Sequence, residues 1–152
     1  MEDRQSTSWR VRLSSYAPIL LWVVVIFLLS SDTGSSIQTS RFVRPLLQFL
    51  FPNAPDSTIR LYHHYIRKTA HFTEYAVLAG LLYRTFLILT PAFKYWAVSV
   101  LLIVAVVACL DELNQSFVSS RTASPYDSLL DIAGGAFAVL VIWLVRRRSA
   151  RG

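Results

Sequence analysis

Four long apolar segments constrain this chain more than any other feature. They cover residues 13–31, 69–89, 95–113 and 126–145. A helix of about 20 mostly apolar residues crosses the hydrocarbon core of a bilayer, and a soluble domain of 152 residues rarely contains four such segments. The apolar fraction of 54% also excludes a disordered chain, which requires low hydrophobicity. The sequence therefore predicts an all-α polytopic membrane protein, a four-transmembrane-helix bundle that forms one domain over residues 1–152.

The connection between the first two segments, residues 32–68, is long for a loop. Within residues 42–51, apolar side chains alternate with Arg44 and Gln48, a pattern typical of an amphipathic helix on a membrane surface. Pro55 and its neighbours then predict a break in that helix. We expect the helix to cover the bundle, in preference to acting as a substrate gate.

The first apolar segment has an alternative interpretation. Arg10 and Arg12 followed by an apolar run could form a signal peptide. The run has no clear A-x-A cleavage site, however, and Trp22 lies inside it. We therefore expect a retained span, and cleavage would leave the orientation of the other three spans unchanged.

The distribution of basic residues predicts the orientation. With the N-terminus inside, nine of the 15 Lys and Arg residues fall on the inner side and six on the outer side. The run from Arg146 to Arg151 supplies much of this difference. Basic residues beside the spans favour the cytoplasmic side, so both termini are predicted to be cytoplasmic. The same placement favours a membrane flank over a nucleic-acid surface as the meaning of the net charge of +6.

Polar and ionisable residues gather at the outer ends of three spans. The second span enters from the outside, the third leaves on that side and the fourth re-enters there, so these polar ends share one depth. Ionisable groups inside a membrane are costly and usually face a bundle interior or a wet cavity. The residues concerned are Lys68, His71, Glu74, Asp111, Glu112, Gln115, Asp127 and Asp131, with Arg121 in a connecting loop.

This set suggests a polar site that opens toward the outer leaflet. Lys68 and Arg121 are candidate partners for an anionic head group such as a phosphate, and His71 is a candidate base or proton shuttle. The alternative is purely structural, a salt-bridge network that holds the helices together. The candidate catalytic set is completed by Glu74, Asp111, Glu112 and Asp127, and the ligand-binding set by Gln115 and Asp131.

The sequence predicts neither a metal site nor a cofactor. A single Cys excludes a Cys-based zinc site. His71 beside two carboxylates is a conceivable metal site, but it lacks the paired-His spacing of the recognised motifs.

Two further features concern packing. Gly134 and Ala138 have the small-residue spacing that lets two membrane helices approach closely. Gly135 and Val139 fit this spacing less well. Cys109 lies among apolar residues and is expected to be a packing residue.

A set of short motifs runs in order along the spans. It consists of Lys68-x-x-His71-Phe72-x-Glu74-Tyr75-x-x-Leu78, then Asp111-Glu112-x-x-Gln115, then Arg121, Asp127, Asp131 and Gly134. Together with a first span that ends Ile26-Phe27-Leu28-Leu29-Ser30-Ser31, this set resembles the VanZ-like family of bacterial membrane proteins. Many members place Pro-Gly before the loop Arg, where this chain has Ser119-Ser120-Arg121, so the loop shape is expected to differ.

The resemblance implies a protein of the bacterial cytoplasmic membrane and cell envelope, and it gives weight to the polar set. The founding member of the family is associated with resistance to the glycopeptide antibiotic teicoplanin. The resemblance implies no particular reaction, so it leaves open whether the chain is an enzyme.

These observations lead to one main hypothesis and two alternatives. In the main hypothesis, the outward-facing pocket binds or acts on an anionic envelope amphiphile, such as a lipid-linked wall precursor, a polyprenyl phosphate or a glycopeptide. The first alternative is a proton-coupled transporter or flippase subunit. Four spans are few for a transport pathway, so this alternative requires a homo-oligomer. The second is a non-catalytic subunit of a larger envelope enzyme. Membrane lipids are expected partners in every case, and nucleic acid in none.

Overall fold

The computed structural model describes residues 2–31, 36–90, 94–117 and 124–149. Within these residues it contains five helices and no strand. All of the helices except α2 are long and apolar enough to cross a membrane, which confirms the predicted four-span, all-α fold. The helices are α1 (Glu2–Leu29), α2 (Ser36–Leu50), α3 (Asp56–Leu89), α4 (Trp96–Ser116) and α5 (Pro125–Ser149).

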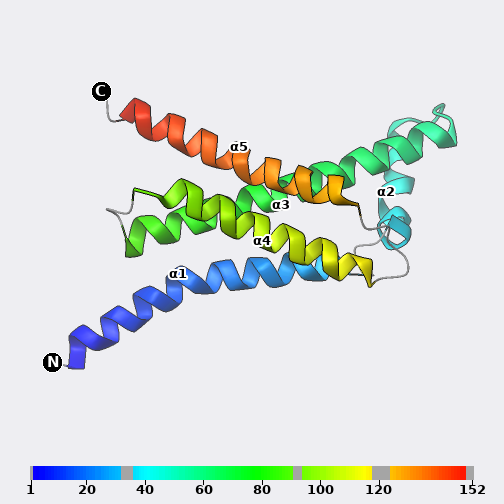
Figure 1. Ribbon diagram of the computed structural model, residues 1–152. Helices are drawn as coiled ribbons and strands as arrows, with labels where there is room; N and C mark the ends of the chain where they lie inside the picture. Colours follow the sequence, from blue (N-terminus) through cyan, green and yellow to red (C-terminus); the bar gives the residue numbers. More distant parts are fainter. Residues whose placement is uncertain (1, 32–35, 91–93, 118–123, 150–152) are drawn as a thin grey trace.

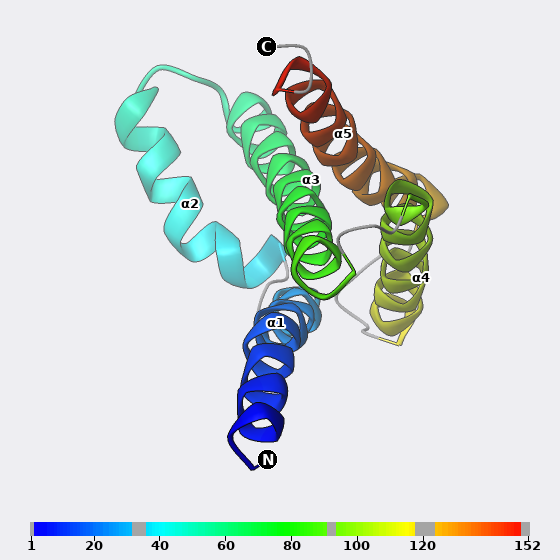
Figure 2. The same cartoon turned by 90° about the vertical axis from the view of Figure 1, so that its left-hand side faces the viewer.

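The four long helices run in alternating directions along one axis (Figure 1). α5 packs against α3 and α4, and α1 packs against the same two helices (Figure 2). The start of α1 and the end of α5 lie at one end of the bundle, which we call the terminal end. α2 lies at the opposite end, which we call the α2 end.

α3 is much longer than the span predicted from the sequence. It begins at Asp56, directly after Pro55, whose backbone is extended (φ −65°, ψ 154°). It has 34 residues, which correspond to a length of about 51 Å. The hydrocarbon core of a bilayer is about 30 Å thick. The first turns of α3 therefore project beyond the bundle at the α2 end (Figure 1), where Ile59 is buried.

α2 confirms the predicted amphipathic helix but not its predicted position. Among the described helices it contacts only α3, and it lies beside the bundle in the end-on view (Figure 2). The expectation that it covers the bundle is therefore wrong, because the short Pro-containing turn after α2 keeps it alongside the projecting part of α3. Leu47 is buried, whereas Phe42 and Phe49 are exposed, as expected of a helix at a membrane surface.

Two adjacent glycines let α5 pack closely between its neighbours. A Cβ atom at Gly134 would lie 2.2 Å from the backbone oxygen of Phe72 on α3, and one at Gly135 would lie 2.7 Å from Cγ1 of Val104 on α4. The close approach predicted at Gly134 is confirmed. The buried apolar core around these contacts consists of Ile26, Tyr75, Leu78, Ala79, Leu82, Val100, Val104, Val107, Ala108 and Val139.

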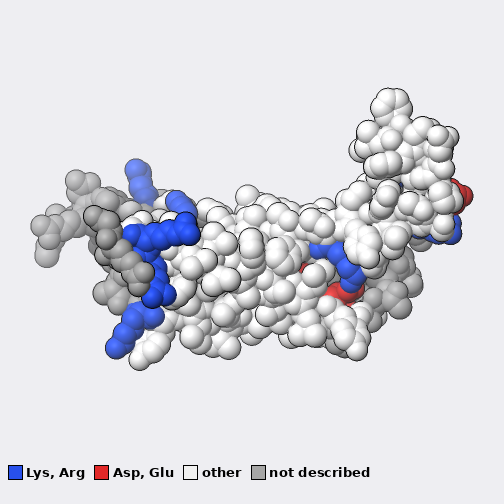
Figure 3. Space-filling model, turned by 90° about the horizontal axis from the view of Figure 1, so that it is seen from above, with Lys and Arg blue, Asp and Glu red and all other residues white. Residues whose placement is uncertain are grey.

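The outer faces of the helices are apolar. Between 11% and 28% of the most apolar window of each span is buried inside the bundle, so most of its hydrophobic surface faces outward, toward lipid. Cys109 is exposed on α4, so the expectation that it packs in the bundle is wrong. Figure 3 shows a broad uncharged band between the Lys and Arg side chains at the terminal end and the charged groups at the α2 end. This surface is that of a multi-pass membrane protein.

Candidate functional site

Polar side chains from four helices meet inside the bundle close to its α2 end. α1 contributes the residue that follows it, Ser30, and the other helices contribute residues that the sequence singled out. Arg121, the remaining predicted site residue, lies outside the described residues. We call the following set the polar cluster: Ser30, Lys68, His71, Glu74, Asp111, Glu112, Gln115, Asp127 and Asp131.

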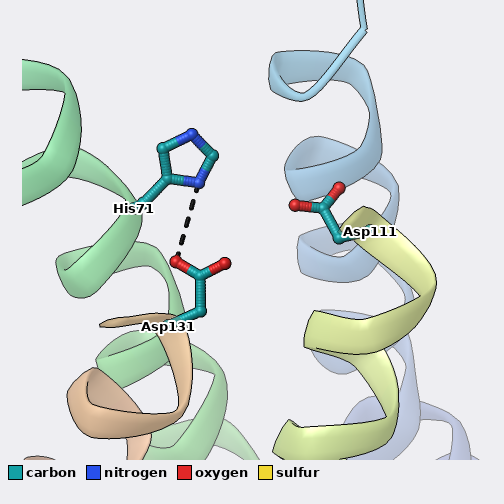
Figure 4. A group of neighbouring side chains, drawn as sticks. All are labelled: His71, Asp111 and Asp131. Atoms are coloured by element: carbon teal, nitrogen blue, oxygen red, sulfur yellow. Dashed lines mark ion pairs between the residues drawn. The ribbon is translucent and has the colours of Figure 1, made fainter. Parts of the chain in front are cut away.

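His71 on α3 faces a carboxylate of α5 (Figure 4). Its Nδ1 atom lies 3.8 Å from Oδ1 of Asp131 and 3.9 Å from Oε2 of Glu74, one turn along the same helix. Asp111 projects from α4 toward this pair (Figure 4). One donor atom from each of His71, Asp111 and Asp131 lies within 4.8 Å of the other two, so three helices bring ionisable groups to one point.

Asp111 is fully buried and accepts hydrogen bonds from Ser30, which follows α1, and from Gln115 on its own helix. Ser30 Oγ donates to its Oδ2 atom over 2.8 Å, and Gln115 Nε2 donates to the same oxygen over 3.0 Å. Gln115 Nε2 also lies 3.4 Å from Ser30 Oγ. A buried carboxylate needs such donors because it has lost its water. The three side chains therefore join the end of α1 to α4.

Lys68 and Asp127 form the more exposed part of the polar cluster. Lys68 Nζ lies 2.5 Å from Asp127 Oδ1, with 34% and 41% of the two side chains exposed. A second connection leads from α4 to the start of α5, where the backbone N–H of Ser124 donates to Glu112 Oε1. The role predicted for Lys68 in holding an anion stays a prediction, but its charge is matched by a carboxylate of the chain itself.

The polar cluster is acidic. Of its described members, Lys68 and His71 alone can carry positive charge, against five carboxylates. The Asp131 carboxylate is close enough to the other four to interact with the charge of each. The four carboxylates that act on Asp131 are Asp111, Glu74, Asp127 and Glu112. A site with this excess of negative charge suits a cation or a mobile proton better than a phosphate group.

Sequence reasoning gave no role to three residues of this region. Trp22 on α1 donates its indole N–H to the backbone oxygen of Glu74 over 2.9 Å, Ser30 holds Asp111, and the buried Tyr75 hydroxyl interacts with the charge of Asp111. A polar atom inside an apolar span needs a hydrogen-bonding partner, so the sequence does indicate that these three residues have one. It does not indicate which residue the partner is, because that depends on the rotation of each helix about its axis.

A basic groove of about 380 Å³ lies between α2 and the projecting turns of α3. His63 and His64 belong to it. Both fall in the connection that the sequence predicted over residues 32–68, and both are helical in the structure. Thr39 Oγ1 lies 3.1 Å from His63 Nε2, and Arg44 pairs with Asp56 over 2.8 Å. We call this the basic groove, lined by Ser40, Arg44, Ile59, Arg60, His63, His64 and Arg67.

The basic groove reaches the polar cluster along α3. Arg67 precedes His71 by four residues, which is about one helical turn, and its guanidinium interacts with the charge of Asp127. A second groove of about 400 Å³ between α2 and α3 is almost entirely apolar. We call it the apolar groove, lined by Leu47, Phe51, Tyr62, Tyr65, Ile66 and Thr69.

A family model described as VanZ/LLP1 matches residues 16–146, which is most of the chain. The chain belongs to the VanZ/LLP1 family. This confirms the resemblance stated from the motifs, and both grooves and the described polar cluster lie inside the region that matches the VanZ/LLP1 model. No curated protein and no solved structure shows significant similarity to the chain.

Proposed function

We propose that this VanZ/LLP1 protein binds an anionic envelope amphiphile at the α2 end of its bundle. The observation that carries the proposal is the basic groove, which ends beside the polar cluster at the projecting part of α3. The ligand class comprises a lipid-linked wall precursor, a polyprenyl phosphate and a glycopeptide. A wall-precursor ligand would also account for the association of the founding member with teicoplanin resistance.

The basic groove supplies the groups that an anionic head group needs. Guanidinium groups bind phosphate and carboxylate oxygens through paired N–H donors, and Arg44, Arg60 and Arg67 all line this groove. Asp56 offsets only the charge of Arg44. The head group is therefore assigned to the basic groove, rather than to Lys68 as the sequence suggested.

The apolar groove supports binding of the hydrocarbon part of the same ligand. It lies between the same two helices and is lined mainly by aromatic and aliphatic side chains. Phe51 and Tyr62 face each other there at 5.2 Å between ring centroids. An amphiphile thus finds a cationic surface and an apolar surface at the α2–α3 contact, as amphipathic helices at membrane surfaces provide.

The charge distribution supports one orientation of the protein in the membrane. Lys and Arg side chains gather at the terminal end (Figure 3), and basic flanks favour the cytoplasm. The proposal places the terminal end in the cytoplasm of a bacterium and the α2 end at the outer face of its inner membrane. The ligand would then enter from the outer leaflet.

The packing of the core favours binding over transport. A transport pathway would need polar groups between the polar cluster and the terminal end. The core side chains on that route include Leu78, Leu82 and Val100, all of them apolar and buried. The partner-subunit alternative is compatible with the grooves, because a bound amphiphile could be presented to a larger envelope enzyme.

Native mass spectrometry of the protein released from its own membranes tests this proposal. We expect a specific anionic isoprenoid or lipid-linked species on the parent protein. The double variant Arg60→Gln/Arg67→Gln should lose it, and Arg147→Gln/Arg148→Gln, which removes the same charge at the terminal end, should keep it. The mass of the ligand distinguishes the three ligand classes, and Arg121→Ala tests the sequence-based prediction for that residue. Bulk phospholipid alone on all proteins would contradict the proposal.

A further inference from the structure

Three side chains of the types that ligate metals, one from each of three helices, lie close together inside the polar cluster (Figure 4). Donor atoms of His71, Asp111 and Asp131 all lie within 4.8 Å of one another. Ligands about 2.0–2.2 Å from a tetrahedral Zn²⁺ ion lie about 3.3–3.6 Å apart. The three donor atoms would therefore have to approach one another by little more than about 1 Å to share one ion, a movement that side-chain torsions supply.

The Asp131 carboxylate gives a second, independent indication of a bound cation. Its side chain is almost completely buried, with 2% of the residue exposed. Its Oδ1 atom points toward His71 at 3.8 Å and accepts no hydrogen bond from any described residue. A carboxylate oxygen buried in this way is strongly destabilised unless a cation or a donor faces it.

Asp111 is oriented by its neighbours. Ser30 and Gln115 both donate to Oδ2 of Asp111, which fixes the plane of that carboxylate. Hydrogen-bonding neighbours of this kind hold the ligands of metal sites in position. Glu74 Oε2 lies 3.9 Å from the same His71 nitrogen that faces Asp131, so Glu74 adds negative charge beside the three residues.

The charges of the three groups also match a divalent cation. Two aspartates and a neutral imidazole around one such ion form an uncharged unit, which can be buried in a membrane bundle at much lower cost than two bare carboxylates. Lys68 pairs with Asp127 rather than with either of these aspartates.

From these observations, we propose that His71, Asp111 and Asp131 form a site for a divalent transition-metal ion. One imidazole nitrogen and two carboxylate oxygens suit Zn²⁺ or Mn²⁺, whereas Mg²⁺ and Ca²⁺ prefer oxygen ligands throughout. The proposal is independent of amphiphile binding in the basic groove. With the ion bound, the His71 imidazole would be a metal ligand, so its lone pair would not serve the base or proton-shuttle role suggested from the sequence.

Metal binding to the purified full-length protein in lipid nanodiscs tests the proposal. The protein is treated with a chelator and desalted, and Zn²⁺ or Mn²⁺ is then added alone. Bound metal is measured by elemental mass spectrometry, the affinity by competition with a chelating dye, and Mn²⁺ coordination by electron paramagnetic resonance. We expect saturation near one ion per chain and weaker binding of Mg²⁺.

Variants separate a metal site from a general effect of negative charge. His71→Gln and Asp131→Asn should each weaken metal binding by more than about 100-fold, since loss of a supporting neighbour alone costs 10–100-fold. Asp127→Asn removes a carboxylate whose charge acts on Asp131 but which is not among the three proposed ligands, so it should weaken metal binding only slightly. Arg60→Gln in the basic groove should retain the parent affinity. His71 retains some exposure, so His71→Gln provides the test even if Asp131→Asn does not fold, as judged by circular dichroism.

Two results would overturn the proposal. One is the absence of saturable Zn²⁺ or Mn²⁺ binding to the folded parent protein, which would make the polar cluster a salt-bridge network. The other is an equal loss of metal affinity in Asp127→Asn and His71→Gln. That result would show that the metal is held by nonspecific attraction to the carboxylates. Because no amphiphile is added, neither result depends on the proposed function.

Discussion

Ser30 Oγ donates a 2.8 Å hydrogen bond to Oδ2 of the buried Asp111, 81 residues further along the chain. Ser30 directly follows α1, and Asp111 lies near the end of α4. The bond therefore ties the first span to the ionisable centre of the bundle. Without it, α1 would be held mainly by apolar packing, by the Trp22 contact to Glu74 and by the Thr85 hydroxyl bonded to Ser15.

Replacement of Ser30 by Ala should lower the free energy of unfolding by about 1.5–3 kcal/mol, the usual value for a hydrogen bond to a charged group. Thermal unfolding in detergent measures the change. Ser116→Ala is the matched control, because its hydroxyl donates to the nearby Leu113 carbonyl on an exposed surface, and it should change stability by less than about 0.5 kcal/mol. Equal effects of the two substitutions would contradict the assigned role of Ser30.

Gly134→Ala should destabilise the bundle by about 1–3 kcal/mol, because the added methyl group would overlap the Phe72 backbone, which cannot move aside as a side chain can. Gly135→Ala should cost less, since it meets the side chain of Val104. Gly80→Ala has open space around its Cβ position and should stabilise α3 by up to about 1 kcal/mol. A series of unfolding midpoints checks this order, and a Gly134→Ala protein as stable as Gly80→Ala would refute the close contact.

The Lys68–Asp127 pair should contribute little to stability, because both side chains are partly exposed. A double-mutant cycle with Lys68→Gln and Asp127→Asn should give a coupling energy of about 0.2–1 kcal/mol. Raising the salt concentration should reduce it further. A coupling several times larger would show that the pair is a principal support of the bundle rather than a peripheral contact.

The proposed orientation predicts which residues a membrane-impermeant maleimide reaches in intact cells. Asn53→Cys, in the exposed turn between α2 and α3, should be labelled from outside. Ser149→Cys, at the end of α5, should be labelled only after the membrane is opened. Both are made in a Cys109→Ala background, because Cys109 is the single native thiol. The opposite labelling pattern would place the basic groove in the cytoplasm.

Much of the polar cluster could be predicted because ionisable residues are rare inside membrane spans and therefore conspicuous. Once four spans were assigned, alternation of direction brought His71, Asp111 and Asp131 to one depth. The close contact at Gly134 was predictable for a similar reason, since small residues at membrane helix contacts have a recognisable spacing.

Other features were not available from the pattern. The sequence marked a span from residue 69, because the aromatic and basic residues before it resemble a loop on hydropathy alone; the structure continues α3 back to Asp56. This extension creates both grooves, so neither could be predicted. The exposure of Cys109 could not be predicted either, because a membrane span has apolar residues both on its lipid-facing side and on its core-facing side.

The sequence by itself determined the class of the protein, the number of spans and the depth of their ionisable residues, because these depend on hydropathy along the chain. Only the tertiary structure decided that Ser30 reaches Asp111, that Lys68 is engaged by Asp127, and that α2 lies beside the bundle. Those relationships depend on the rotation of each helix about its axis and on its neighbours. In a membrane span that is apolar on nearly every side, the rotation is fixed by a few polar contacts and close glycine contacts between helices.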